Sequence, residues 1–164
     1  MTIMATRRRF RTQRSVSYDR PAEVLAVLQH ARSIVEAGWV QNRWTGTATS
    51  AGGAVGGDGS ARRAGGGVAD GSGRACLVGA VALAVRARDP RADLAVGTGP
   101  ALAFVADAVL GERAAGRSAP HHVRVQRMRE LARWNDEPGR TRADVVAALD
   151  RAAAAVVARV VQPA

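Results

Sequence analysis

The chain of 164 residues is predicted to fold as an all-α protein, a compact single-domain bundle of about five helices. Apolar residues make up 47% of the sequence and aromatic residues only 4%, so the core depends on closely packed helices rather than on large side chains. The apolar residues indicate helices in five segments, two of them apolar all round and three amphipathic. This pattern is typical of buried helices covered by surface helices.

The first helix is expected over residues 20–37. Asp19 offers an N-cap, and Pro21 stands near the first helical position. Apolar residues then repeat at helical spacing from Val24 to Val35, and Gly38 suits the C-terminal cap.

A glycine-rich segment, residues 45–74, follows and contains eleven of the 18 glycines of the chain. It cannot bury enough apolar area to offset its backbone entropy, so we expect a disordered loop. A second helix is expected to begin near Cys76, because the run from Cys76 to Val85 is apolar all round. Asp89-Pro90 should end it.

Three more helices are expected in the C-terminal half. Gly99-Pro100 opens a helix over residues 100–110, which Gly111 closes. A strongly basic helix is expected over residues 120–134. The longest helix should begin at Thr141, because valine, leucine and alanine residues line one face of the sequence that follows.

The charge of the chain is strongly positive. Its net charge is +10, and all 24 basic residues are arginine. Residues 1–17 have no apolar period and are interpreted as a flexible basic arm on a helical domain of residues 18–164. The arm holds five arginines, Arg7, Arg8, Arg9, Arg11 and Arg14. A basic domain of this size favours anionic partners.

The arginines of the arm and of the basic helix are the candidate nucleic-acid site. Arg124 and Arg127 in that helix could join the arm in neutralising phosphates. The sequence therefore predicts a non-enzymatic binding protein for an anionic partner, most plausibly nucleic acid or a nucleoprotein. The alternative for the same arginines is a solvated helix face. The alternative function is then a protein-interaction or assembly module, including self-association.

The segment from Trp134 to Thr141 links the last two predicted helices. Pro138-Gly139 has the order of a type II turn, and Thr141 with Asp144 approximates a capping box. The other residues of the segment are not required to connect two helices. The residues left over are candidates for a pocket: Trp134, Asn135, Asp136 and Arg140.

Cys76 supports an enzyme hypothesis. It is expected at a helix N-terminus, where the dipole and free N–H groups stabilise a thiolate. With His30 as base and Asn135 or Asp136 as orienting group, it could serve a cysteine-dependent hydrolase. The alternative is a small buried cysteine packed among alanines, and we expect binding rather than catalysis.

Other classes of site have little support in the sequence. The rings of His121 and His122 would diverge by about 100° on a helix, so a metal site is not expected, and no cofactor is indicated. No apolar run is long enough to cross a bilayer, and no secretory signal follows the basic start. A single cysteine fits a reducing compartment, so a cytoplasmic protein without a membrane partner is expected.

Motifs near the ends of the predicted helices resemble those of an uncharacterised family. They are Gly38-Trp39, Cys76-Leu77-Val78-Gly79-Ala80, Trp134-Asn135-Asp136 and Arg140-Thr141. The family is actinobacterial, with some members in phage genomes, and carries a domain of unknown function. The resemblance covers roughly residues 20–155 apart from the glycine-rich insertion, and it implies a small helical domain with no known reaction. The insertion and the arginine-rich start depart from the family, so no function is carried over to them.

Overall fold

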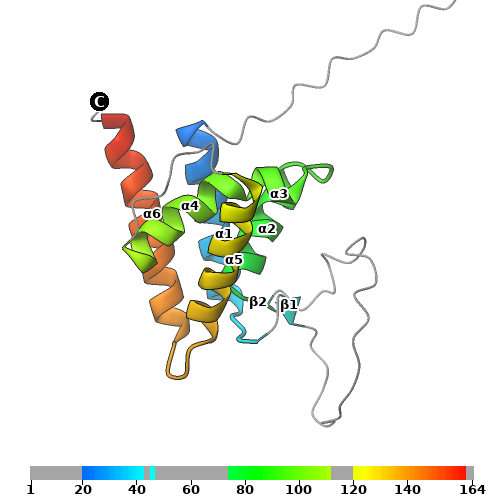
Figure 1. Ribbon diagram of the computed structural model, residues 1–164, viewed down its shortest axis with the longest axis vertical. Helices are drawn as coiled ribbons and strands as arrows, with labels where there is room; N and C mark the ends of the chain where they lie inside the picture. The colour runs from blue at the N-terminus through cyan, green and yellow to red at the C-terminus, as the bar shows by residue number, and fades with distance from the viewer. Residues whose placement is uncertain (1–19, 43–44, 47–73, 112–119, 162–164) are drawn as a thin grey trace, which may run out of the picture.

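The computed structural model describes residues 20–42, 45–46, 74–111 and 120–161 (Figure 1). The predicted basic arm, Asp19 and residues 47–73 of the glycine-rich segment lie outside this part of the chain. The helices and strands in chain order are α1 (Pro21–Ala37), β1 (Thr45–Gly46), β2 (Arg74–Ala75), α2 (Leu77–Arg88), α3 (Leu94–Gly97), α4 (Gly99–Leu110), α5 (His121–Asp136) and α6 (Arg142–Val161).

The all-α class and the five predicted helices are confirmed. Helices α1, α2, α4, α5 and α6 are 12 to 20 residues long. All five begin within two residues of the expected positions, and the first four also end within two residues of them. Two features were not predicted: the single turn α3, and an antiparallel pairing of Thr45 with Ala75 and Gly46 with Arg74. Both are too short to produce a hydrophobic period in the sequence.

The core is built from leucine, valine and alanine side chains on all five long helices. Helix α1 packs mainly against α6 and α2, and α4 packs against α6. Helix α5 lies against α4 and α2 through fewer contacting residues, and the orange turn below the helices in Figure 1 connects it to α6. Eight of the twelve residues of α2 are buried, as its uniformly apolar sequence predicts. No helix of the described residues is long and apolar enough to span a membrane.

Gly38 ends α1 and allows the chain to pass close to β2. Its N–H donates to the carbonyl of Ile34, and its own carbonyl accepts from the N–H of Ala75 at 3.0 Å. The φ angle of Gly38 is 179°, which any residue adopts, so the backbone conformation does not require glycine. A Cβ at this position, however, would lie 2.5 Å from Cγ of Arg74. Glycine is therefore needed here for space.

Candidate functional site

Asn135 occupies the centre of a polar network at the C-terminal end of α5. Its side chain is 0% exposed. The Oδ1 atom accepts hydrogen bonds from the indole Nε1–H of Trp39 at 2.8 Å and from the backbone N–H of Leu77 at 3.0 Å. Leu77 is the first residue of α2, whose initial N–H groups have no partner within the helix. Asn135, in the last turn of α5, therefore satisfies one of the free N–H groups at the start of α2.

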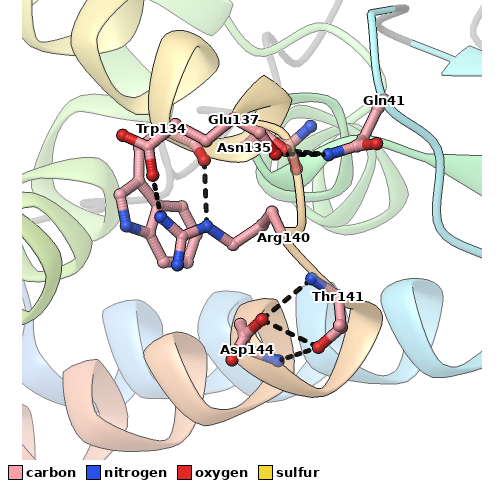
Figure 2. A network of polar contacts seen from close by, with 7 residues as sticks. All are labelled: Gln41, Trp134, Asn135, Glu137, Arg140, Thr141 and Asp144. Carbon is pink, nitrogen blue, oxygen red and sulfur yellow. Dashed lines mark hydrogen bonds and ion pairs between the residues drawn. The ribbon is translucent and has the colours of Figure 1, made fainter.

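The same network holds the segment that follows α1. The amide of Asn135 donates to the carbonyl of Val40 at 3.2 Å, and Asp136 accepts from the backbone N–H of Asn42 at 2.7 Å. Gln41 donates to the carbonyls of Asn135 and Glu137 (Figure 2). Asn135 also donates to Oδ1 of Asp136 at 2.8 Å. Its partners Trp39, Val40 and Leu77 are far from it in sequence, and we name this group the Asn135 network.

Trp134, in the last turn of α5, contacts Arg140, at the end of the turn that follows the helix. The guanidinium of Arg140 lies over the Trp134 ring, 4.0 Å from its centroid, and its Nε donates to the Trp134 carbonyl at 3.1 Å (Figure 2). Arg140 also pairs with Glu137. The N–H of Arg140 donates to the Glu137 carbonyl, and Gly139 has a φ of 84°, which confirms the predicted type II turn.

The predicted capping box at the start of α6 is confirmed. The N–H of Thr141 donates to Oδ2 of Asp144 at 2.8 Å, and the N–H of Asp144 donates to Oγ1 of Thr141 at 3.2 Å (Figure 2). The backbone and hydroxyl hydrogen bonds from Thr141 lower the pKa of Asp144, and the positive charges of Arg140 and Arg151 lower it further.

This capping box predicts a specific dependence of stability on acid. A carboxyl whose pKa is lowered by folding stabilises the fold above its unfolded pKa, and it loses that contribution as the pH falls through the folded value. We expect Asp144→Asn to be less stable than the wild type at neutral pH, with a difference that closes on acidification. Urea unfolding at a series of pH values measures this, and a constant difference would contradict it.

Of the four residues predicted to form a pocket, one borders a hollow. Asp136 lines a shallow depression of about 630 Å³ together with Asn42, Glu137, Arg129 and Arg133. Asn135 is fully buried, and Trp134 and Arg140 are engaged with each other. The depression is lined by both carboxylate and guanidinium groups, so its charge does not favour either an anionic or a cationic ligand.

Cys76 is the N-cap of α2, and its side chain is buried. Its Sγ accepts a hydrogen bond from the N–H of Gly79 at 3.3 Å. Burial raises the pKa of the Cys76 thiol, and the negative charge of Asp136 also raises it, while hydrogen bonds from the backbone act in the opposite direction. The structure brings Cys76 near Asn135 and Asp136, but His30 is exposed on α1 and shares no hydrogen bond with Cys76 in the described part of the chain.

These surroundings predict an unreactive thiol. Because the thiolate is the nucleophile, a raised pKa and burial both slow its reaction with a disulfide reagent. In the folded protein at neutral pH, we expect Cys76 to react with 5,5′-dithiobis(2-nitrobenzoate) at least about tenfold more slowly than in urea. Fast modification in native buffer would contradict this and would favour the hydrolase hypothesis.

A second site lies at the opposite end of α5. A pocket of about 510 Å³ is enclosed by α2, α3, α4, α5 and the residues that precede α3, and we name it the α2–α5 pocket. Most of its wall is apolar and includes Val78, Ala82, Leu94, Leu102, Val125 and Met128. Its polar lining residues are Arg86, Asp93, Thr98, His121, Arg124 and Arg127.

Two arginines of this pocket have nitrogen atoms that lack a partner. The Nε atoms of Arg86 and Arg124 are buried and make no hydrogen bond within the described part of the chain. Arg127 is only 8% exposed, and both it and Asp93 have polar or electrostatic partners. Thr98 donates its hydroxyl hydrogen to the carbonyl of Leu94 at 2.6 Å. Arg86 and Arg124 therefore each keep a hydrogen-bond donor that no described group satisfies.

Sequence reasoning selected Arg124 and Arg127 as surface contacts for nucleic acid, whereas the structure places both in the wall of the pocket. The exposed arginines of α5 are instead Arg129 and Arg133. Helical spacing could have indicated that Arg124 and Arg127 face inward. Both lie on the same face of α5 as Leu131, which is fully buried. The five arginines of the predicted arm lie outside the described residues.

Metal ligands are not clustered in the described residues, which contain no group of three or more histidine, cysteine, aspartate or glutamate side chains placed to hold an ion.

The fold and this site define an all-α domain with a largely apolar pocket that is lined in part by arginines. The chain belongs to a family of unknown function, DUF6197, which it matches over residues 19–155. This confirms the predicted membership of an uncharacterised family, while the actinobacterial or phage origin stays a prediction. No curated protein and no solved structure matches the chain.

Proposed function

We propose that the protein is a non-enzymatic binding protein whose ligand is a small organic anion with an apolar body, held in the α2–α5 pocket. One observation carries the proposal: Arg86 and Arg124, which both line this pocket, each have a buried Nε atom without a partner among the described residues. A buried donor on a charged group is costly when it has no acceptor. A bound anion supplies that acceptor.

The rest of the pocket suits the apolar part of such a ligand. Its volume of about 510 Å³ falls in the range of roughly 300–1,000 Å³ that is usual for small-molecule sites. Apolar side chains from four helices form most of the wall, with a few polar groups among them. Cys76, the only nucleophile suggested by the sequence, is not one of the lining residues, which favours binding over catalysis.

Titration with 8-anilinonaphthalene-1-sulfonate tests the proposal, because this probe combines an aromatic body with one anionic group. We expect saturable fluorescence enhancement with one probe per chain. Arg124→Leu should weaken binding at least about tenfold by removing a charged hydrogen-bond donor. Arg129→Leu is the matched control: it makes the same change on the same helix at an exposed residue outside the pocket, and it should bind as the wild type does. Equal affinities for wild type and Arg124→Leu would contradict the proposal.

A second candidate is nucleic-acid binding, which the exposed side of α5 favours. Arg129 and Arg133 lie one turn apart there and form no ion pair with the described residues. With the arm they could contact phosphates, and affinity would then fall steeply with salt. Filter binding at two salt concentrations should show a smaller salt dependence after deletion of residues 1–14 or after Arg129→Ala with Arg133→Ala. Failure to bind at low salt would overturn this candidate.

A further inference from the structure

We infer that the anionic group recognised in the α2–α5 pocket is a carboxylate, held jointly by the side chains of Arg86 and Arg124. The inference rests on the proposed function and narrows its ligand to an amphipathic monocarboxylate. Three observations carry it: the anchored guanidinium of Arg86, the unpartnered side chain of Arg124, and the charge and polarity of the remaining wall.

Arg86 has a fixed orientation. Its Nη1 donates to the carbonyl of Pro90 at 2.6 Å, just beyond the end of α2. The Nε atom on the other side of the guanidinium is buried and has no partner in the described part of the chain. The edge formed by Nε and Nη2 presents two parallel N–H bonds, whose spacing matches the two oxygens of a carboxylate. A carboxylate that reaches this edge can accept from both N–H groups at once.

Arg124 brings a second guanidinium from a different helix. It lies on the first turns of α5, and its Cδ is 3.5 Å from the position of a Cβ built on Gly99, the first residue of α4. Its side chain thus passes close to the start of α4. Its Nε is buried without a partner, and Arg124 forms no ion pair with any described residue. Two guanidinium groups in one pocket can share a carboxylate, which has about four acceptor positions.

The rest of the wall favours a single negative charge on an apolar body. Asp93 also lines the pocket, so a phosphate dianion would face a carboxylate and would carry a larger desolvation cost than a monoanion. Val78, Leu102 and Met128 provide the apolar contact. The flexible side chain of methionine can pack against apolar ligand groups of different shape. An alkyl or aryl carboxylate satisfies both requirements.

Isothermal titration of the full chain with four compounds of equal chain length tests the chemistry: octanoate, octyl phosphate, octan-1-ol and octylamine. Octanoate should bind at least about tenfold more tightly than octan-1-ol, because charge-assisted hydrogen bonds are added. Octyl phosphate should bind more weakly than octanoate, and octylamine should bind weakest. Tighter binding of octyl phosphate, or equal binding of octan-1-ol, would overturn the inference.

The arylsulfonate titration separates this inference from the proposed function. If octanoate fails to bind while 8-anilinonaphthalene-1-sulfonate still binds in an Arg124-dependent way, then only the carboxylate assignment is overturned. If neither compound binds, the proposed function fails as well.

A double-mutant cycle tests whether one head group contacts both arginines. Octanoate affinity is compared for the wild type, Arg86→Leu, Arg124→Leu and the double variant. If the two side chains hold the same carboxylate, the fold-loss in the double variant should be clearly smaller than the product of the two single losses. If the loss of affinity in the double variant equals the product of the two single losses, the two arginines do not share one head group.

Stability of the ligand-free protein is the structural control. Because the Nε of Arg124 has no hydrogen-bond partner and Arg124 forms no ion pair in the described part of the chain, Arg124→Leu should leave the unfolding midpoint unchanged or raise it. A large fall in the midpoint would overturn the inference, since it would show that this guanidinium serves the fold.

Discussion

Replacing Asn135 with alanine should reduce the free energy of unfolding by about 3 kcal/mol, because it leaves buried hydrogen-bonding groups without partners. The substitution removes the acceptor of the Trp39 indole and of the Leu77 N–H, together with the donor to the Val40 carbonyl. Each unsatisfied buried group costs about 1–3 kcal/mol, and the half-buried Trp39 can regain part of this from water.

Urea unfolding of the full chain measures this loss. Gln41→Ala is the matched control, since Gln41 donates to two carbonyls at the outer side of the same network without being buried, and we expect a loss of at most about 1 kcal/mol. The backbone N–H of Leu77 should also exchange with solvent much faster in Asn135→Ala. Stability within about 0.5 kcal/mol of the wild type would contradict a structural role for the Asn135 network.

Leu131→Ala should have an effect of similar size, for a different reason. Leu131 is 0% exposed, and it is the one large apolar side chain of α5 that is fully buried. Truncation creates a cavity and removes apolar contacts between α5 and the core, which costs about 2–5 kcal/mol. Leu131→Met, which conserves the volume, should cost less than about 1.5 kcal/mol. Equal stability of the alanine and methionine variants would show that α5 is not held by this contact.

Most of the fold could be predicted because its signals are local. The helical period of α1, the uniformly apolar run of α2 and the Thr141–Asp144 capping box each depend on neighbouring residues. Gly111 ends α4 with a φ of 67°, as expected for a C-terminal glycine. The short elements α3 and β1–β2 were not predicted, because so few residues show no hydrophobic period in the sequence.

The candidate sites could be predicted only in part, because they join distant segments. The unusual density of Trp134, Asn135 and Asp136 was visible in the sequence, but Trp39, Val40 and Leu77, which Asn135 joins, lie 58 to 96 residues away from it. The sequence pattern was therefore compatible both with a ligand pocket and with a purely structural role for these residues. In the structure, the polar groups of Asn135 are all used within the fold.

The α2–α5 pocket was hidden for a related reason. Arg86 follows an apolar run, and Arg124 stands in a helix rich in arginine, so both resemble solvated side chains. Only the tertiary packing of α2 against α5, with the chain from Ala92 to Leu94 beside them, encloses both arginines in one wall. The number of arginines indicates an affinity for anions. It does not show whether the anion is a polymer bound at the surface or a small molecule bound in a pocket.

Nitrogen-15 NMR of the arginine Nε–H groups during a titration with octanoate is the most direct test of the pocket. We expect the resonances of Arg86 and Arg124 to shift together and to saturate with a single dissociation constant, while those of the exposed Arg129 and Arg133 stay unchanged. Unperturbed resonances of Arg86 and Arg124 at saturating octanoate, or shifts confined to the exposed arginines, would contradict it.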